Sequence, residues 1–167
     1  MYQNILVPLD GSELAECTLP HVESIAKGCQ VNNVTLIQVV EPASWESLAM
    51  PIPASITLHN TPPTNAGLAE GLERMELESK AQAEGYLQRV AGRLAYDGEV
   101  KIEVMVGKVV ESITEYASSI NADLIIIATH GRSGASRWIW GSVADRILRS
   151  ACVPVLMVRG PGCVVGI

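Results

Sequence analysis

The chain has 167 residues, about the size of one domain, and its 48% apolar and 18% charged residues are typical of a globular rather than a disordered protein. Its formal charge of −6 argues against a dedicated nucleic-acid-binding protein, whose binding surface would be basic. The apolar runs are far shorter than the roughly 20 residues of a membrane helix and no signal peptide is recognisable, so we expect a single cytoplasmic domain over residues 1–167 without a membrane partner.

The charge is distributed unevenly along the chain. Residues 124–167 contain five arginines and one acid, Asp145, a net charge of +4 that leaves −10 on residues 1–123. An acidic protein with a basic C-terminal quarter is suited to holding a small anion there. The alternative is a chance clustering of arginines on solvated helix faces.

The N-terminal part of the sequence predicts two buried strands joined by a helix. Asn4–Leu9 contains the continuous apolar run of a strand covered on both faces of a parallel sheet, and Ser12 follows as an N-cap. Apolar residues then recur at helical spacing up to Gly28, which we expect to close the helix. Pro20 should kink or split this helix, and Val34–Val40 is the second buried strand.

The segment 41–69 interrupts this periodicity. It holds five of the nine prolines, together with the apolar residues Trp45, Met50, Ile52 and Ile56. An irregular insertion of this length within a domain is typical of a lid, a partner-binding loop or disorder. Its apolar residues predict that it lies against the domain or against a second subunit.

A long helix and an edge strand are expected next. The apolar face of the helix, which Asp97–Gly98 should end, consists of Leu72, Met75, Ser79, Ala83, Tyr86, Val90 and Leu94. Apolar and polar residues then alternate over Val100–Val106, which predicts a half-exposed strand at a sheet edge. Gly107 turns the chain into a short helix through Val110, Ile113 and Ala117.

The C-terminal part predicts two further strands. Leu124–Thr129 is apolar almost throughout and should be a central strand. The loop His130–Trp140 leads into a helix over 141–149. The fifth strand, Val153–Val158, contains Pro154 near its start, which favours an edge position, and a C-terminal tail covers 160–167.

This alternation of strands and helices predicts an α/β fold of three layers, with an open parallel five-stranded sheet between helices, as in Rossmann-like nucleotide-binding folds. The two edge strands and the two central strands fit the order 3-2-1-4-5. In that order the topological switch point lies between the first and fourth strands, and ligands bind at the carboxyl ends of the strands there. The residues that leave these strands are Pro8–Ser12 and Ala128–Gly131.

The loop after the fourth strand suits phosphate binding. Its glycines allow backbone amides to approach a phosphate, and the helix that begins at Gly141–Ser142 presents unpaired N–H groups and a partial positive charge. Arg132 and Arg137 would add charge-assisted contacts. The loop lacks the Gly-Lys-Ser/Thr of a P-loop and the spacing of G-x-G-x-x-G, so an ordinary strand-to-helix loop is the alternative.

Over nearly its whole length, from Asn4 to Val158, the chain resembles the universal stress proteins. The most specific resemblance is Ala128-Thr129-His130-Gly131-Arg132-Ser133-Gly134 followed by Trp140-Gly141-Ser142-Val143-Ala144-Asp145-Arg146. The nucleotide-binding branch of that family carries Gly, two residues, Gly, nine residues, and then Gly-Ser or Gly-Thr. Here Gly131 and Gly141–Ser142 match that pattern, whereas Ala128 replaces the first glycine and places a methyl group where the ligand approaches most closely.

The resemblance implies that the chain binds an adenine nucleotide (ATP, ADP or AMP) and acts as a homodimeric regulator of stress responses, with slow ATP hydrolysis at most. Pro8 and Leu9 would line the adenine pocket, the backbone of Val40 would bond the adenine edge, and Gly107 would leave room for the ribose. Asp10 would contact the ribose or a Mg²⁺ ion beside the phosphates. The remaining residues of the implied site are Ala128, His130, Gly131, Arg132, Gly141, Ser142 and Val143. Fifth strands would pair in the dimer, which would act on an unidentified regulatory protein.

Several alternatives stay open at this point. Asp10 is either a ligand contact or a turn residue that bonds its own backbone, and His130 either touches phosphate or faces solvent. No Ser-His-acid or paired-carboxylate arrangement supports an acyl-transfer or glycosidase activity. The alternative function is a dimeric interaction module of the same fold that binds no nucleotide.

Overall fold

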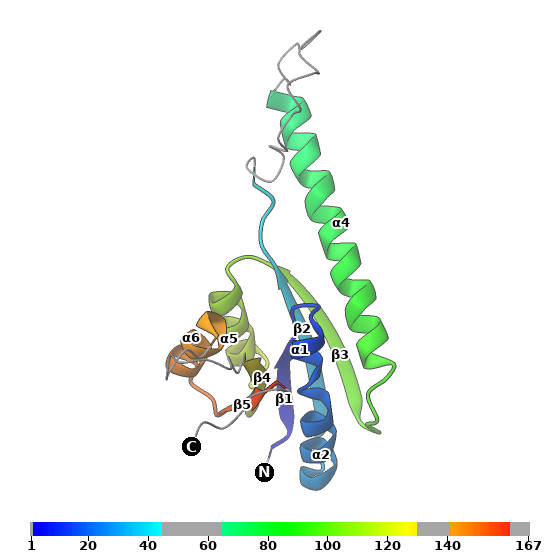
Figure 1. Cartoon of the computed structure of the whole chain (residues 1–167), viewed down its shortest axis with the longest axis vertical. Coiled ribbons are helices and arrows are strands. Elements are labelled where there is room, and N and C mark those ends of the chain that lie inside the picture. Colours follow the sequence, from blue (N-terminus) through cyan, green and yellow to red (C-terminus); the bar gives the residue numbers. More distant parts are fainter. Residues whose placement is uncertain (1, 45–64, 130–140, 161–167) are drawn as a thin grey trace.

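The computed structural model describes residues 2–44, 65–129 and 141–160 of the chain. Its five strands are β1 (Asn4–Pro8), β2 (Asn33–Val40), β3 (Glu99–Val106), β4 (Leu124–Thr129) and β5 (Val155–Arg159). They form one parallel sheet in the order β3-β2-β1-β4-β5, with β1 and β4 in the interior (Figure 1). The expected α/β fold and strand order are therefore confirmed.

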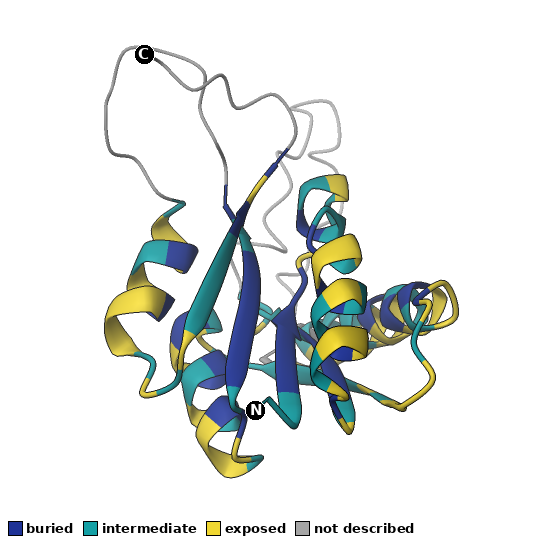
Figure 2. Ribbon diagram, turned by 90° about the horizontal axis from the view of Figure 1, so that it is seen from below, coloured by how far each residue is buried: buried dark blue, intermediate teal, exposed yellow. Residues whose placement is uncertain are grey.

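Helices cover both faces of the sheet, as Figure 2 shows. Successive side chains of a strand point to opposite faces, so Ile5 and Val7 pack with one cluster and Leu6 with the other. The first cluster includes α1 (Glu13–Glu16), α2 (Leu19–Cys29) and the C-terminal half of α4 (Asn65–Ala91). The second includes α5 (Val109–Ser119) and α6 (Ser142–Ser150). Burial on both faces explains why β1 and β4 are apolar almost throughout.

The predicted helix after β1 is split, as Pro20 suggested. Ser12 caps α1 by accepting a hydrogen bond from the Ala15 N–H at 3.1 Å. Pro20 lies in the first turn of α2, where its missing N–H removes no helical hydrogen bond. The expectation that Gly28 closes the helix is wrong. The helix runs to Cys29, and Gln30 ends it in the left-handed conformation with its N–H bonded to Ala26.

The long helix α4 begins inside the segment expected to be irregular and ends earlier than Asp97–Gly98. After Ala91 the chain tightens into a turn in which the Leu94 N–H bonds the Ala91 carbonyl, while the Ala95 N–H bonds Glu23 of α2. These contacts hold Leu94 in the core beyond the end of the helix. The C-terminal half of α4 packs on the sheet, and its N-terminal half extends away from it (Figure 1). The rest of the insertion, 45–64, lies outside the described residues.

Candidate functional site

A cavity of about 280 Å³ lies at the carboxyl ends of β1 and β4, at the predicted switch point. The residues leaving β1, the end of β4 and the start of α6 form its walls. Of the residues predicted for the site, those that line it are Pro8, Leu9, Asp10, Ala128, Gly141, Ser142 and Val143. Segments more than 100 residues apart in the sequence thus meet at one hollow, as the strand order requires.

The N-terminus of α6 faces this cavity. The first hydrogen bond within the helix runs from the Asp145 N–H to the Gly141 carbonyl at 2.9 Å, so the N–H groups of Ser142, Val143 and Ala144 precede the helical ladder. All three residues line the cavity, and the helix dipole adds a partial positive charge at this end. Unpaired amides and a positive helix end are the features that bind phosphate groups.

The start of α6 is held in place by β4. The buried Thr129 side chain accepts a hydrogen bond from the Gly141 N–H at 3.2 Å. Gly141 itself has φ −52° and ψ 136°, a conformation that any residue adopts. The backbone conformation at this position therefore does not require glycine. Gly141 is itself one of the residues that line the cavity.

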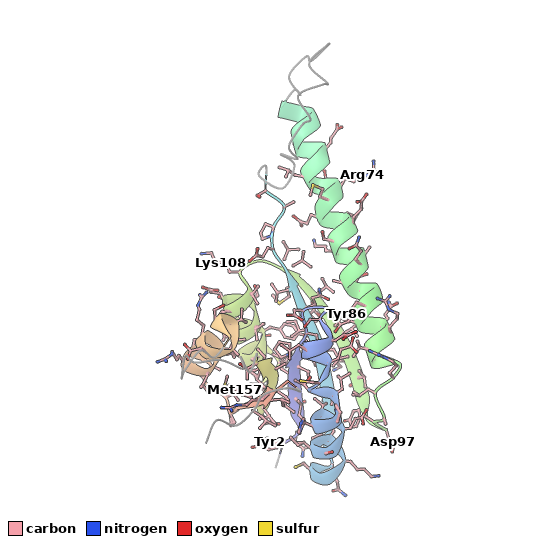
Figure 3. All side chains as sticks on the ribbon, in the orientation of Figure 1. Tyr2, Arg74, Tyr86, Asp97, Lys108 and Met157 are labelled. Atoms are coloured by element: carbon pink, nitrogen blue, oxygen red, sulfur yellow. The ribbon has the colours of Figure 1, made fainter. Side chains whose placement is uncertain are left out.

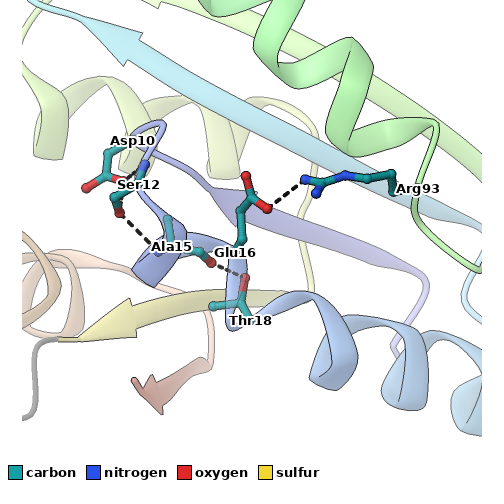
Figure 4. Close-up of polar contacts among 6 residues, drawn as sticks. All are labelled: Asp10, Ser12, Ala15, Glu16, Thr18 and Arg93. Carbon is teal, nitrogen blue, oxygen red and sulfur yellow. Dashed lines mark hydrogen bonds and ion pairs between the residues drawn. The ribbon is translucent and has the colours of Figure 1, made fainter. Parts of the chain in front are cut away.

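Asp10 forms a tight turn at the mouth of the cavity, drawn in Figure 4. Its Oδ1 accepts hydrogen bonds from the Ser12 N–H at 2.9 Å and from the Ser12 hydroxyl at 2.5 Å. Between them Gly11 has φ +84°, a left-handed conformation that favours glycine. The carboxylate is exposed. Asp10 is thus a turn residue, and its position at the cavity leaves it able to contact a ligand as well.

The inner wall of the cavity is apolar. Ile37 and Val39 of β2, Ile113 of α5 and Ile127 of β4 line it beside Leu9. A surface of this kind suits a flat apolar ring better than a charged group. The phosphate-type wall and the apolar wall therefore belong to one cavity, as a nucleotide requires.

Val39, rather than the predicted Val40, lines this cavity. The Leu9 N–H bonds the Ile37 carbonyl at 2.8 Å and the Gly107 N–H bonds the Val40 carbonyl at 3.0 Å. Because backbone groups alternate in direction along a strand, those of Val39 point to the β1 side, beyond the last residue of β1. The period-two alternation of β2 is a signal in the sequence from which this difference between Val39 and Val40 could have been predicted.

The other predicted site residues either do not line the cavity or lie outside the described residues. Gly107 follows the edge strand β3 and does not line the cavity, while His130, Gly131 and Arg132 lie outside the described residues. The sequence analysis also missed lining residues from α1 and α5, of which Leu14, Ala15 and Val109 are examples. Of these three, Ala15 belongs to the apolar helical pattern of the sequence, but such a pattern does not show that a residue lies beyond the ends of the strands.

Two of the C-terminal arginines form ion pairs away from the cavity. Arg146 pairs with Glu111 at 3.0 Å, and Arg149 pairs with Asp145 at 2.9 Å. These guanidinium groups are well exposed and none lines the cavity. Arg146 and Arg149 therefore lie on solvated surface, in agreement with the alternative stated above.

A metal ion at this site would need some of its coordinating atoms from the bound molecule. Within 2–44, 65–129 and 141–160, no three His, Cys, Asp or Glu side chains are grouped so as to hold a metal. Asp10 is the acidic residue among those that line the cavity. Mg²⁺ is commonly held by one or two carboxylates together with substrate phosphates, so the donor set fits a magnesium–nucleotide complex.

No helix in the described ranges is long and apolar enough to cross a membrane.

Comparison with known proteins gives consistent matches over the whole fold. The model of the universal stress protein family matches residues 1–159. Universal stress protein MJ0531 of Methanocaldococcus jannaschii is 31% identical over 164 residues, which span 96% of this chain and 84% of that protein. The solved structure of MJ0577 from the same organism has a TM-score of 0.65 at 26% identity, covering 95% of this chain and 96% of that one. A crystal structure of a universal stress protein in complex with cAMP has a TM-score of 0.64 at 19% identity, with 95% and 97% covered; this last likeness concerns the fold alone.

Proposed function

The chain belongs to the universal stress protein family, and from this premise we propose that it binds an adenine nucleotide, with ATP as the main ligand, in the cavity at the switch point. The observation that carries the proposal is the arrangement of the cavity walls. The amides of Ser142, Val143 and Ala144, which precede the first hydrogen bond within α6, lie on one wall, and the apolar side chains of β2 and β4 line another. A nucleotide has a phosphate end and a flat ring that match these two surfaces.

In this proposal the phosphates bind at the N-terminus of α6, and the adenine lies against Leu9 and Val39. The free backbone groups of Val39 bond the adenine edge, in the role first expected of Val40. Asp10 contacts the ribose or a Mg²⁺ ion shared with the phosphates. A protein of the same fold crystallised with cAMP, an adenine nucleotide, supports this choice of ligand class.

The replacement of the first motif glycine by Ala128 is compatible with this arrangement. Ile127 packs with the α5 and α6 cluster, and side chains alternate along a strand. The Ala128 methyl group is therefore directed to the α1 face, away from the α6 amides. We propose that it narrows the α1 side of the cavity without obstructing the phosphate end.

We assign the site to binding, with little or no hydrolysis. Asp10 is the titratable residue among those described as lining the cavity, and one of its oxygens is held in the turn with Ser12. We further propose that the protein acts as a cytoplasmic homodimer that signals nucleotide occupancy to a regulatory protein. The edge strand β5 is its pairing surface, because β4 is its one strand neighbour in the described sheet.

Titration calorimetry tests the proposed ligand. The protein is first unfolded and refolded to remove any molecule that co-purifies, and is then titrated with ATP in the presence and in the absence of magnesium. We expect saturable heat and a matching rise in thermal stability that follows mass action, about 2.7 kcal/mol at a hundredfold excess of ligand over the Kd. Absence of heat up to millimolar ATP favours the interaction module that binds no nucleotide.

A further inference from the structure

A second hollow lies on the opposite face of β2 from the cavity described above. It occupies about 580 Å³ between α4, the end of β2 and Gly11, and we call it the α4 groove. Gln38 and Val40 reach it from β2, whereas Ile37 belongs to the cluster on the other face. The two hollows share Val39, and the Asp10–Ser12 turn separates them. The α4 groove is therefore a separate site.

Two buried polar atoms of the groove lack hydrogen-bond partners. Among the described residues, these are the Oε1 atom of Gln38 and the hydroxyl oxygen of Tyr86. They come from opposite walls of the groove, β2 and α4, and Figure 3 shows Tyr86 between α4 and the sheet. Buried polar groups are nearly always paired, because an unpaired one destabilises the fold. Retaining two such atoms beside one hollow points to a ligand that bonds them.

The protonation state of Tyr86 defines what it offers a ligand. The Glu16 carboxylate lies near it but is paired with Arg93 at 2.6 Å, and the phenol makes no hydrogen bond of good geometry with it. Burial first, then the charges of Glu16 and Asp10 and a polar contact with the Glu16 side chain, raise the pKa of Tyr86 to about 12, and the charge of Arg93 opposes this shift. The phenol therefore keeps its proton and acts as a donor.

The rest of the groove is polar and carries one positive charge. Ser79 and Gln82 add neutral hydrogen-bonding groups, and Arg89 is the charged residue of the described lining, while the nearby carboxylates of Glu16 and Asp10 act on its Tyr86 end. Arg89 forms no ion pair within the part of the chain that the structure describes. In a protein with a net charge of −6, an unpaired guanidinium beside neutral polar groups is suited to an anion.

We propose that the α4 groove is a second binding site, for a small hydroxylated molecule that carries one carboxylate or phosphate group. Arg89 binds the anionic group and the Tyr86 hydroxyl donates to the ligand. A ligand hydroxyl donates to Gln38 Oε1, and Gln82 bonds the outer hydroxyls.

The first arm of the test measures the stability of the full chain without ligand. Tyr86→Phe and Gln38→Met remove the unpaired oxygens and preserve the apolar volume. Each substitution is expected to raise the Tm by about 2–4 °C, because a buried group without a partner is lost. If neither substitution raises the Tm, the oxygens already have partners and the proposal is overturned.

The second arm measures binding by saturation-transfer NMR and calorimetry. The probes are D-gluconate and glucose 6-phosphate, which distinguish a carboxylate from a phosphate ligand, with glucose as the neutral control. Arg89→Gln is expected to weaken binding of the preferred anion about tenfold. Arg74→Gln, on the exposed part of the same helix, and Gly141→Val, in the first cavity, are expected to leave it unchanged. Binding of neither anion, or a loss caused by Gly141→Val instead of Arg89→Gln, overturns the proposal.

Discussion

Gly141→Val is the substitution that tests the proposed phosphate site most selectively. The backbone of Gly141, with φ −52° and ψ 136°, accepts valine without strain. Its N–H bond to Thr129 and its carbonyl bond to Asp145 involve backbone atoms that the substitution keeps. Gly141 lines the cavity of about 280 Å³ next to Ser142, Val143 and Ala144, so we expect the added side chain to take up space beside the α6 amides. The fold is therefore expected to survive while the ligand is displaced.

The size of the effect follows from the hydrogen bonds that are lost. If the phosphates retreat from two of the amides, two charge-assisted hydrogen bonds of about 1.5–3 kcal/mol each disappear. A loss of about 3 kcal/mol corresponds to a weakening of at least about 100-fold in the Kd. Calorimetric titration with ATP measures this change, and thermal unfolding verifies that the variant is folded.

Gly28→Val provides a matched control. Gly28 is an exposed glycine in α2, and a Cβ added there would meet nothing within 4 Å. The control should therefore bind ATP as the unmodified chain does. Unchanged affinity in Gly141→Val, or an equal loss in Gly28→Val, would show that the phosphate site has been placed wrongly.

Three further predictions concern the surroundings of the site. Thr129→Val removes the acceptor of the Gly141 N–H and is expected to destabilise the fold by about 1–3 kcal/mol in urea unfolding, whereas Thr129→Ser restores most of this stability; equal stability of the two variants would exclude the role of the hydroxyl. Asp10→Asn keeps the turn but removes the charge, so the dependence of ATP affinity on magnesium should disappear in paired titrations with magnesium and with a chelator; a persistent dependence would place the metal elsewhere. The raised pKa of Tyr86 favours the protonated folded state, so its contribution to stability is present below pH 10 and is lost as the pH rises towards about 12; Tyr86→Phe should lack this part of the decline in urea midpoints, and an identical decline in both proteins would contradict the assignment.

The strand order could be predicted from the sequence because burial leaves a direct pattern. A continuous apolar run such as that of β4 requires cover on both faces, and the alternation in β3 fits a sheet edge. With right-handed crossovers these two signals leave few topologies. The switch point, and with it the cavity, followed from the order alone.

Helix ends were harder to predict, because tertiary contacts decide them. Gly28 looked like the end of α2, yet Gln30 takes the left-handed position. Ala91 ends α4 because the following turn is bonded to Glu23 of α2, which brings Leu94 into the core. A pattern of apolar residues marks a buried face but does not record such contacts between helices.

The ligand contact expected at the exit of β2 stays a prediction. The sequence analysis identified the exit of this strand but chose Val40, whose carbonyl is used by Gly107, rather than Val39. The α4 groove had no signal in the pattern, because Tyr86 fits the apolar face of its helix. Its hydroxyl is found to lack a hydrogen-bond partner among the described residues only once α4 is packed against β2.

Backbone amide shifts measured by NMR during titration with ATP test the central claim most directly, because they report both binding and its location. We expect saturable changes that are largest at Ser142, Val143 and Ala144, with a second group at Asp10 and Val39. Shifts that saturate while the three α6 amides stay unchanged, or no shifts at millimolar ATP, would contradict a nucleotide site at the N-terminus of α6.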